Sequence, residues 1–423
     1  MPPKPTKTQT LRILFLSLLL DLLSFTFILP LYPSLLHFYQ TSTPPSPLLH
    51  KTLLTLQTYK STLSLPPGEK YDTILLGGAL GSLFSFCQAL TSPFIGTYSD
   101  KYGRRPALLL SLAGNILSLI TWTLAPNFEF FLLSRVIAGL SEGNIQIALT
   151  IVSDVSSEKE RGGAMALVGA CFSIAFTFGP ALGAGLSRFA VVERNPFAVA
   201  AGVALGLVML EAGVVYVYLP ETRAGGREAP HGRDASRNRH ASRTNSHALL
   251  NTTQLLFVLV FSGMEFSVPF VMFEMFGFSA EQRGRVLGYI GLVASLLQGG
   301  VVRRMKPLRA VQVGVAACAA AFFTLAGLET QMGLYAAATL LAVTSATVVM
   351  GLNSLSSLEA GSGERGERLG NHRRFGQVGR TLGPVVFCSV YWWVGRERAF
   401  IIGGLGMVGV GVLVGMLRQP VER

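Results

Sequence analysis

The chain has 423 residues, of which 50% are hydrophobic and only 14% are charged. Soluble globular domains carry about a quarter charged residues, so this composition excludes an ordinary soluble protein and indicates a membrane protein. The formal net charge of +12 is compatible either with nucleic-acid binding or with an uneven distribution of charge across a membrane.

Apolar stretches long enough to cross the roughly 30 Å hydrocarbon core of a bilayer recur along the whole chain. Those in the first half cover residues 12–36, 72–95, 107–125, 129–152, 164–187 and 197–219. Those in the second half cover residues 252–276, 285–302, 310–328, 332–356, 375–395 and 399–417. The sequence therefore predicts an all-α membrane protein with twelve transmembrane helices.

Two polar segments interrupt this pattern. Residues 220–251 are rich in arginine, serine, asparagine and glycine, which is typical of a disordered linker. We therefore expect an N-terminal six-helix bundle over residues 1–219, a basic linker over 220–251 and a C-terminal six-helix bundle over 252–423. Residues 38–71 follow the first span and contain several prolines. Their composition favours a loosely ordered loop over a lid or cap.

Lysine and arginine are distributed unevenly between alternate loops. If both termini lie in the cytoplasm, 25 of the 35 basic residues lie on that side and nine on the other. Cytoplasmic loops accumulate such residues, so both termini are predicted to be cytoplasmic. The membrane would be the plasma membrane or an endomembrane such as that of the vacuole. The net charge is then a sign of topology, and no nucleic-acid partner is expected.

A short charged loop joins the second and third predicted spans, from residue 96 to residue 106. It combines two glycines, an acid and two arginines: Gly96, Asp100, Gly103, Arg104 and Arg105. Membrane topology accounts for the arginines of such a loop, but not for its glycines and its acid. The spacing resembles the signature loop of the major facilitator superfamily.

Further motifs of that superfamily follow in the first half. Residues 133–144 are similar to its conserved arginine motif, with Arg135 in the fourth span. Residues 176–185 resemble the antiporter motif of drug and proton exchangers, although Ala184 replaces the second of two adjacent glycines. The matching positions of that motif are Gly179, Pro180 and Gly183. The chain is thus most similar to the drug:proton antiporter branch, in particular to its tetracycline transporter-like members in animals.

The two halves also resemble diverged repeats, as in many secondary transporters. Gly96 precedes Gly179 by 83 residues, and Gly300 precedes Gly383 by the same number. A proline follows each later glycine, and a double arginine follows each earlier one. This repetition predicts two pseudo-symmetric bundles, although the second half has no acid that matches Asp100.

The resemblance implies a secondary active transporter that works by alternating access as a monomer in the lipid bilayer, without a cofactor. The antiporter branch implies exchange of protons for organic anions or amphiphilic drugs, which are exported. In this family the loop acid, its arginine and an acid at the end of the fourth span form a latch that holds one conformation. The matching residues are Asp100, Arg104 and Asp154, with Arg105 beside them. As exposed pairs, each would contribute less than about 1 kcal/mol.

Four ionisable residues within the predicted spans are candidates for binding a proton or the substrate: Asp21, Arg135, Glu142 and Glu265. A charge at mid-membrane costs at least about 2.5 to 3.5 kcal/mol, so it normally faces a wet cavity or a partner. An arginine must keep its charge, and Arg135 could pair with Asp21 until that acid takes up a proton. Each residue could instead be a structural group that is hydrogen-bonded to a neighbouring helix.

Other classes of protein find little support in the sequence. There is no nucleotide-binding loop, so ATP-driven transport is disfavoured, and no convincing catalytic triad, so we do not expect an enzyme. The four cysteines lie in different spans, so neither a disulfide nor a metal site is expected. A nutrient or metabolite symporter or uniporter of the same fold remains an alternative, as does a receptor or scaffold that transports nothing.

Overall fold

The structure is a computed structural model that describes residues 6–28, 31–41, 46–62, 69–186, 189, 192, 195–223, 244–361 and 363–420. All regular elements in these ranges are helices. Eleven helical segments of the described chain are long and apolar enough to cross a membrane. A twelfth long helix, α15 (Arg365–Val394), has membrane-spanning length but is more polar. The predicted all-α architecture of twelve long helices is confirmed.

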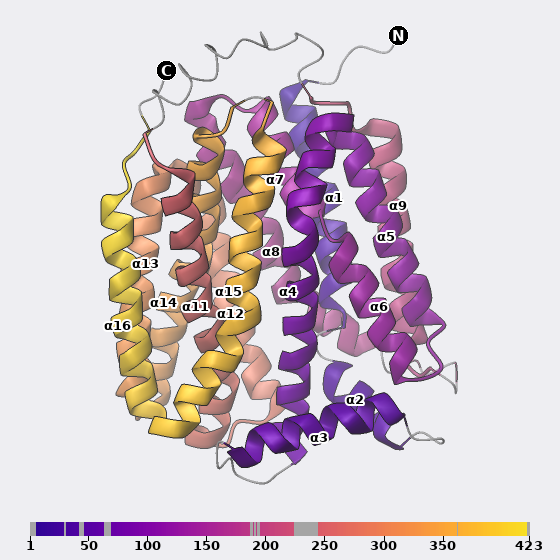
Figure 1. Ribbon diagram of the computed structural model, residues 1–423, viewed down its shortest axis with the longest axis vertical. Coiled ribbons are helices and arrows are strands. Elements are labelled where there is room, and N and C mark those ends of the chain that lie inside the picture. The colour runs from indigo at the N-terminus through magenta and orange to yellow at the C-terminus, as the bar shows by residue number, and fades with distance from the viewer. Residues whose placement is uncertain are drawn as a thin grey trace.

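The two halves lie side by side with their long helices parallel to one axis (Figure 1). The first half contains α1 (Lys7–Thr26), α2 (Tyr32–Thr41), α3 (Pro47–Thr62), α4 (Glu69–Tyr102), α5 (Arg104–Thr123), α6 (Phe128–Ser141), α7 (Asn144–Val155), α8 (Glu158–Leu186) and α9 (Ala198–Tyr218). The second contains α11 (His247–Phe276), α12 (Ala280–Gly299), the short 3-10 helix η2 (Val302–Arg304), α13 (Pro307–Ala326), α14 (Gln331–Leu358), α15 and α16 (Arg396–Met416).

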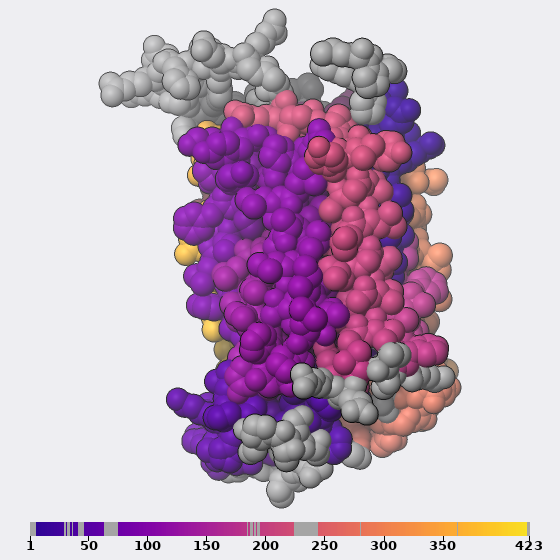
Figure 2. Space-filling model, turned by 90° about the vertical axis from the view of Figure 1, so that its right-hand side faces the viewer, coloured from indigo at the N-terminus to yellow at the C-terminus, as the bar shows by residue number. Residues whose placement is uncertain are grey.

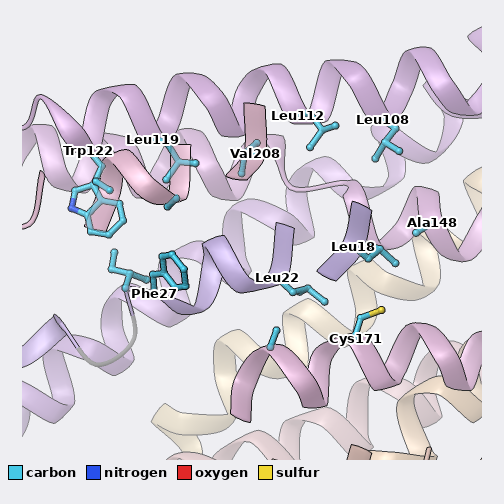
Figure 3. Packing of buried hydrophobic residues seen from close by; sticks show 14 of the residues in the cluster. Leu18, Leu22, Phe27, Leu108, Leu112, Leu119, Trp122, Ala148, Cys171 and Val208 are labelled. Atoms are coloured by element: carbon cyan, nitrogen blue, oxygen red, sulfur yellow. The ribbon is translucent and has the colours of Figure 1, made fainter. Parts of the chain in front are cut away.

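Each half has its own apolar core. One cluster of buried side chains lies almost entirely between residues 14 and 219, and another lies between residues 250 and 417. In the first, Leu18 and Leu22 of α1 lie on the side of Cys171 of α8, and Phe27 lies near Trp122 (Figure 3). Two separate cores allow each half to move as a unit.

The outer wall of the first half is formed by α5 and α9, with α2 and α3 below one end (Figure 2). Large apolar side chains on these two helices are exposed, among them Leu110, Leu117, Met209 and Val217. Exposed apolar faces of this length suit contact with lipid tails. We call the end of the bundle where α1 begins and α16 ends the terminal face, and the end with α2 and α3 the opposite face.

Three predicted segments differ from the structure. The first span is shorter than expected, because α1 ends at Thr26 and α2 begins only at Tyr32. The fourth is interrupted between Ser141 and Asn144. The eleventh begins at Arg365, ten residues early. Most of the predicted linker lies outside the described residues.

The segment after the first span is not a loosely ordered loop over its described part, which forms α2 and α3. The Tyr59 hydroxyl on α3 lies 3.0 Å from that of Ser389 on α15 and donates to the Val385 carbonyl at 3.3 Å. Burial raises the pKa of Tyr59, so the hydroxyl remains protonated. At the opposite face, α3 of the first half therefore touches the second half, as a cap would.

Candidate functional site: an interhelical latch and a charged cavity

The two halves meet mainly along two helix pairs, α4 with α15 and α8 with α12. At the terminal face, glycines let the helices approach closely. A methyl group on Gly96 of α4 would lie 2.2 Å from the carbonyl oxygen of Gly366 on α15. One on Gly163 of α8 would lie 2.7 Å from the carbonyl oxygen of Arg303. Such contacts between main chains close the terminal end of the interface.

A buried network of ion pairs joins the halves at this end. The Arg104 guanidinium donates to Asp100 at 2.6 Å and to Asp154 at 2.8 Å, and only 2% of its side chain is exposed. The second oxygen of Asp154 accepts from Arg365 of the other half at 2.9 Å. The structure brings the predicted latch residues together, but their exposure was predicted wrongly. The close helices exclude water, so removal of one partner costs about 3 to 5 kcal/mol rather than about 1.

Asp100 also binds the backbone of the other half. Its two oxygens accept hydrogen bonds from the N–H groups of Gly366 at 3.0 Å and Glu367 at 2.7 Å. These groups belong to the first turn of α15, where N–H groups lack partners within the helix and the helix dipole attracts a negative charge. Asp100 thus pairs with Arg104 in its own half and caps a helix in the other.

The remaining loop residues hold the latch in place. Gly103 has φ 109°, a conformation that favours glycine, and a methyl group there would lie 2.5 Å from the Glu221 carboxylate. That carboxylate accepts from the backbone N–H groups of Arg104 at 2.9 Å and Arg105 at 3.1 Å, which caps α5. The Arg105 guanidinium lies 5.4 Å from the ring centre of Tyr216. These contacts lie within the first half and fix the loop against α9.

The antiporter-motif glycines lie where α8 packs against α1. A methyl group on Gly179 would lie 1.8 Å from the Thr26 hydroxyl, and one on Gly183 would meet the main chain just after α1 at 2.3 Å. Pro180 lies between them inside α8. Gly383 of α15 has the equivalent place against α11, where a methyl group would lie 2.1 Å from a serine hydroxyl. The later glycines of the two repeats thus have equivalent helix contacts, whereas the earlier ones do not, because Gly96 meets α15 and Gly300 meets only its own helix.

A cavity lies inside the first half, between α1, α4, α5, α6 and α9, with a volume of about 40 Å³, which has room for a few water molecules. Its polar lining consists of Asp21, Ser24, Asn115, Ser118, Arg135 and Glu142. Its apolar lining consists of Phe25, Ile28, Phe84, Leu119, Trp122, Ala138 and Val208. An apolar, aromatic wall with a few convergent polar groups is typical of the lining of small-molecule sites.

Asp21 lies 14 residues into α1, about 21 Å from its start, and is 4% exposed. Its carboxylate lies beside the amides of Asn115 and Asn144 and within electrostatic reach of Glu142. A third acid, Glu211 of α9, is completely buried nearby and accepts from a serine of α1 at 2.7 Å. The interior of this half thus holds three carboxyl groups within electrostatic reach of one another.

Glu142 lies at the interruption of the fourth span, just after α6 ends. One of its oxygens accepts from Asn115 at 3.1 Å, and the other is buried without a hydrogen-bond partner in the described structure. Arg135 and Glu142 are seven residues apart, which would place them on one face of a continuous helix. The interruption between α6 and α7 removes that relation, yet both side chains line the same cavity.

Arg135 contacts aromatic rings at one end of the cavity. Its guanidinium lies 5.1 Å from the ring centre of Trp122 and 5.6 Å from that of Phe131, and its Nε donates to Ser134 at 3.2 Å. Cation–π contacts of this kind stabilise an arginine away from water. Asp21 and Arg135, both described, form no direct ion pair in this conformation.

Arg373 of α15 was missed from the sequence, because it lies before residue 375, where the eleventh span was predicted to begin. Its guanidinium reaches the first half and donates to the side chain of Gln88 on α4 at 3.1 Å. It lies within electrostatic reach of Glu142 and Asp21. The signal that could have revealed it was the concentration of arginine and glycine directly before an apolar run.

Glu265 of α11 lies 3.4 Å from Arg380 of α15, and the two side chains are 49% and 44% exposed. Both residues lie far from the ends of long helices. Charges are costly in lipid, so a half-exposed pair at this depth indicates a water-filled space beside these helices. The described part of the chain contains no group of three potential metal ligands.

Two six-helix halves, an interface closed at one face and ionisable groups at mid-membrane define a transporter of the two-bundle type. The chain belongs to the Major Facilitator Superfamily, whose family model matches residues 14–384. The family predicted from the sequence motifs is confirmed.

Several relatives cover nearly the whole chain. Major facilitator superfamily domain-containing protein 10 of Mus musculus is 33% identical over 99% of this chain and 95% of its own length. The human protein of that name is 32% identical over 94% and 90%. The class E tetracycline resistance protein of Escherichia coli is 26% identical over 80% of this chain and 83% of its own length.

The fold is similar to that of solved transporters. The crystal structure of the human organic anion transporter MFSD10 (TETRAN) has a TM-score of 0.87, with 29% identity over 97% of this chain and 100% of that one. The Escherichia coli fucose:proton symporter FucP has a TM-score of 0.73 at 13% identity, over 98% and 100%, and supports the fold alone.

Proposed function

We propose that this protein is a proton-coupled secondary active transporter, which works by alternating access and exchanges protons for an organic anion or an amphiphilic drug. The observation that carries this proposal is the mid-membrane cavity with its aromatic walls and its buried groups Asp21, Glu142 and Arg135. Buried acids that can gain and lose a proton suit a coupling site. We further propose that the protein acts as a monomer and that the terminal face is cytoplasmic, as the distribution of basic residues favours.

The coupling step follows from the charges across the interface. When Asp21 and Glu142 are ionised, they attract Arg373 of the other half. A proton on either acid weakens this attraction and so changes how strongly the halves hold together at mid-membrane. The latch of Asp100, Arg104, Asp154 and Arg365 then determines how readily the terminal face opens.

The relatives support the substrate class. One structural neighbour is named as an organic anion transporter, and several relatives are named as tetracycline resistance proteins. Exchange of substrate for protons is also the mode that the antiporter motif around Gly179, Pro180 and Gly183 favours.

Cotransport of an anion with a proton is a second candidate, because of Arg373. A proton on Glu142 or Asp21 would release this arginine for an anion, so the two ligands would bind together. A cationic drug, in contrast, would compete with the proton for the same acids. The sign of the coupling therefore depends on the charge of the substrate.

Transport can be tested in proteoliposomes that contain the full chain and a pH gradient of either direction. Accumulation of an organic ion in the more acidic compartment, from which protons flow, supports exchange. Accumulation in the less acidic compartment, into which protons flow, supports cotransport. If no organic anion or cation in a broad panel moves under either gradient, the proposed function is wrong and a receptor or scaffold is favoured.

A further inference from the structure

The helix α15 is the most unusual of the twelve long helices. It is 30 residues long but is not among the eleven segments that are apolar enough to span a membrane. It packs between α4 of the first half and α11 of the second, so it lies at the centre of the molecule. Three of its five arginines, at 365, 373 and 380, contact side chains of other helices, so they need an explanation beyond topology.

Arg373 and Arg380 lie on one face of this helix. They are seven residues apart, which is two helical turns or about 10.5 Å of rise. Arg373 faces Gln88 of the first half, and Arg380 lies beside the half-exposed Glu265. Arg380 thus lies at the water-filled space beside Glu265, and Arg373 lies at the interface between the halves, within electrostatic reach of Glu142 and Asp21.

Neither guanidinium is satisfied in the way that Arg104 is. Arg104 has two carboxylate partners at 2.6 and 2.8 Å. Arg373 has only a neutral amide partner at 3.1 Å, its buried Nε lacks a hydrogen bond, and no carboxylate among the described residues lies within 4.0 Å. The single ion pair of Arg380 is long, at 3.4 Å, and is exposed to water. Both arginines thus retain the capacity to bind an anion.

The geometry points to Arg373 and Arg380 as an anion subsite, which binds the carboxylate or sulfonate of an aromatic organic anion. The ring of such a ligand would lie toward the apolar wall of the cavity, where the rings of Phe25 and Phe84 are 5.4 Å apart. This inference rests on the proposed function for its substrate class, but not on the direction of proton coupling.

The charges that face Arg373 predict how neighbouring residues affect the subsite. They are Glu142 and Asp21 from the first half and Arg380 from its own helix. Ionised Glu142 competes with the anion, so neutral glutamine at this position should tighten anion binding. Arg380 repels Arg373 until an anion neutralises both, so loss of either arginine should weaken binding.

The test measures binding to the purified full chain in nanodiscs by calorimetry. The anionic ligands are 2-naphthoate and 2-naphthalenesulfonate, and the neutral control ligand is the methyl ester of 2-naphthoate. Arg373→Gln should raise the Kd for the anions at least about tenfold, since it removes a charge-assisted hydrogen bond, and Arg373→Lys should raise it less. Arg380→Gln should weaken binding by a smaller factor because its site is wetter. The ester should bind wild type and Arg373→Gln alike.

Arg374→Gln is the matched control, because the neighbouring Arg374 is exposed and lies on a different face of α15. Glu142→Gln gives a second test that does not depend on a loss of binding, since this substitution should lower the Kd for the anions. The inference is overturned if neither anion binds the wild type, or if Arg373→Gln and Arg373→Lys fold, by thermal unfolding, and bind the anions as wild type does. Failure of proton-driven flux with retained, Arg373-dependent anion binding would reject the proposed function and leave the subsite standing.

Discussion

Replacement of Asp154 by asparagine should open the terminal face. The Asp154 carboxylate binds Arg104 at 2.8 Å and Arg365 at 2.9 Å, and its own side chain is 7% exposed. Loss of one partner from a buried ion pair costs about 3 to 5 kcal/mol. Asparagine keeps one oxygen as an acceptor and Asp100 still binds Arg104, so we expect the lower limit, about 3 kcal/mol. If the arginines regain water when the halves separate, this raises the open population about 100-fold.

Ser357 provides a readout of this opening. It is completely buried at the interface, where its hydroxyl is hydrogen-bonded to that of Ser153 in the other half. The four native cysteines are buried. In nanodiscs, the rate at which a polar maleimide labels Ser357→Cys should therefore follow the open population, and Asp154→Asn in this background should raise it about 100-fold.

The control for this experiment is Glu281→Gln, which removes an exposed ion pair with Arg285 whose side chains are 79% and 69% exposed. Such pairs contribute little, so labelling should not change. An unchanged labelling rate in Asp154→Asn, with the fold intact by thermal unfolding, would show that the network does not hold the terminal face closed.

Three further predictions concern other parts of the molecule. Asp21→Asn should abolish pH-driven transport in proteoliposomes while thermal unfolding stays near that of wild type; unchanged transport would remove Asp21 from coupling. Gly96→Ala should speed labelling of Ser357→Cys, because its methyl group would lie 2.2 Å from the main chain of α15. Gly77→Ala on the same helix should not change the labelling rate, because a methyl group there has nothing within 4 Å. Equal effects of the two substitutions would contradict the close-packing argument. Tyr59→Phe removes one hydrogen bond at the opposite face, worth about 1 kcal/mol, and should speed the same labelling by at most about fivefold; a slower rate would mean that α3 favours the other conformation.

The parts that could be predicted from the sequence are those set by short-range patterns. Apolar runs of membrane length predict spans because lipid imposes a minimum length on them. The latch loop could be recognised because Gly103 serves a local turn and Asp100 pairs with Arg104 four residues later, so their spacing is fixed. The partner of Asp154 in the other half, Arg365, lies 211 residues away, and no local pattern connects them.

The eleventh span shows why the remainder could not be predicted. Hydropathy measures preference for lipid, but α15 packs between α4 and α11, so its polar residues carry no lipid penalty. Its start was therefore placed at residue 375 instead of 365. The free energy of the latch ion pairs was mispredicted for a similar reason. Burial of Arg104 depends on how closely two helices from different halves approach, and the sequence does not reveal that distance.

The position of α15 also connects the latch to the proposed anion subsite. Arg365 and Arg373 are eight residues apart on one helix, about 12 Å along its axis. A helix of 30 residues moves largely as a rigid rod, so a displacement that separates Arg365 from Asp154 must also change the distance of Arg373 from Glu142 and Asp21. An anion or a proton at mid-membrane would then bias the latch without touching it, because both sites act on the position of the same helix. Latch substitutions that open the terminal face should therefore alter anion affinity, by at most the factor by which the bound anion alters opening. A latch variant that opens the terminal face without any change in anion Kd would show that α15 does not couple the two sites.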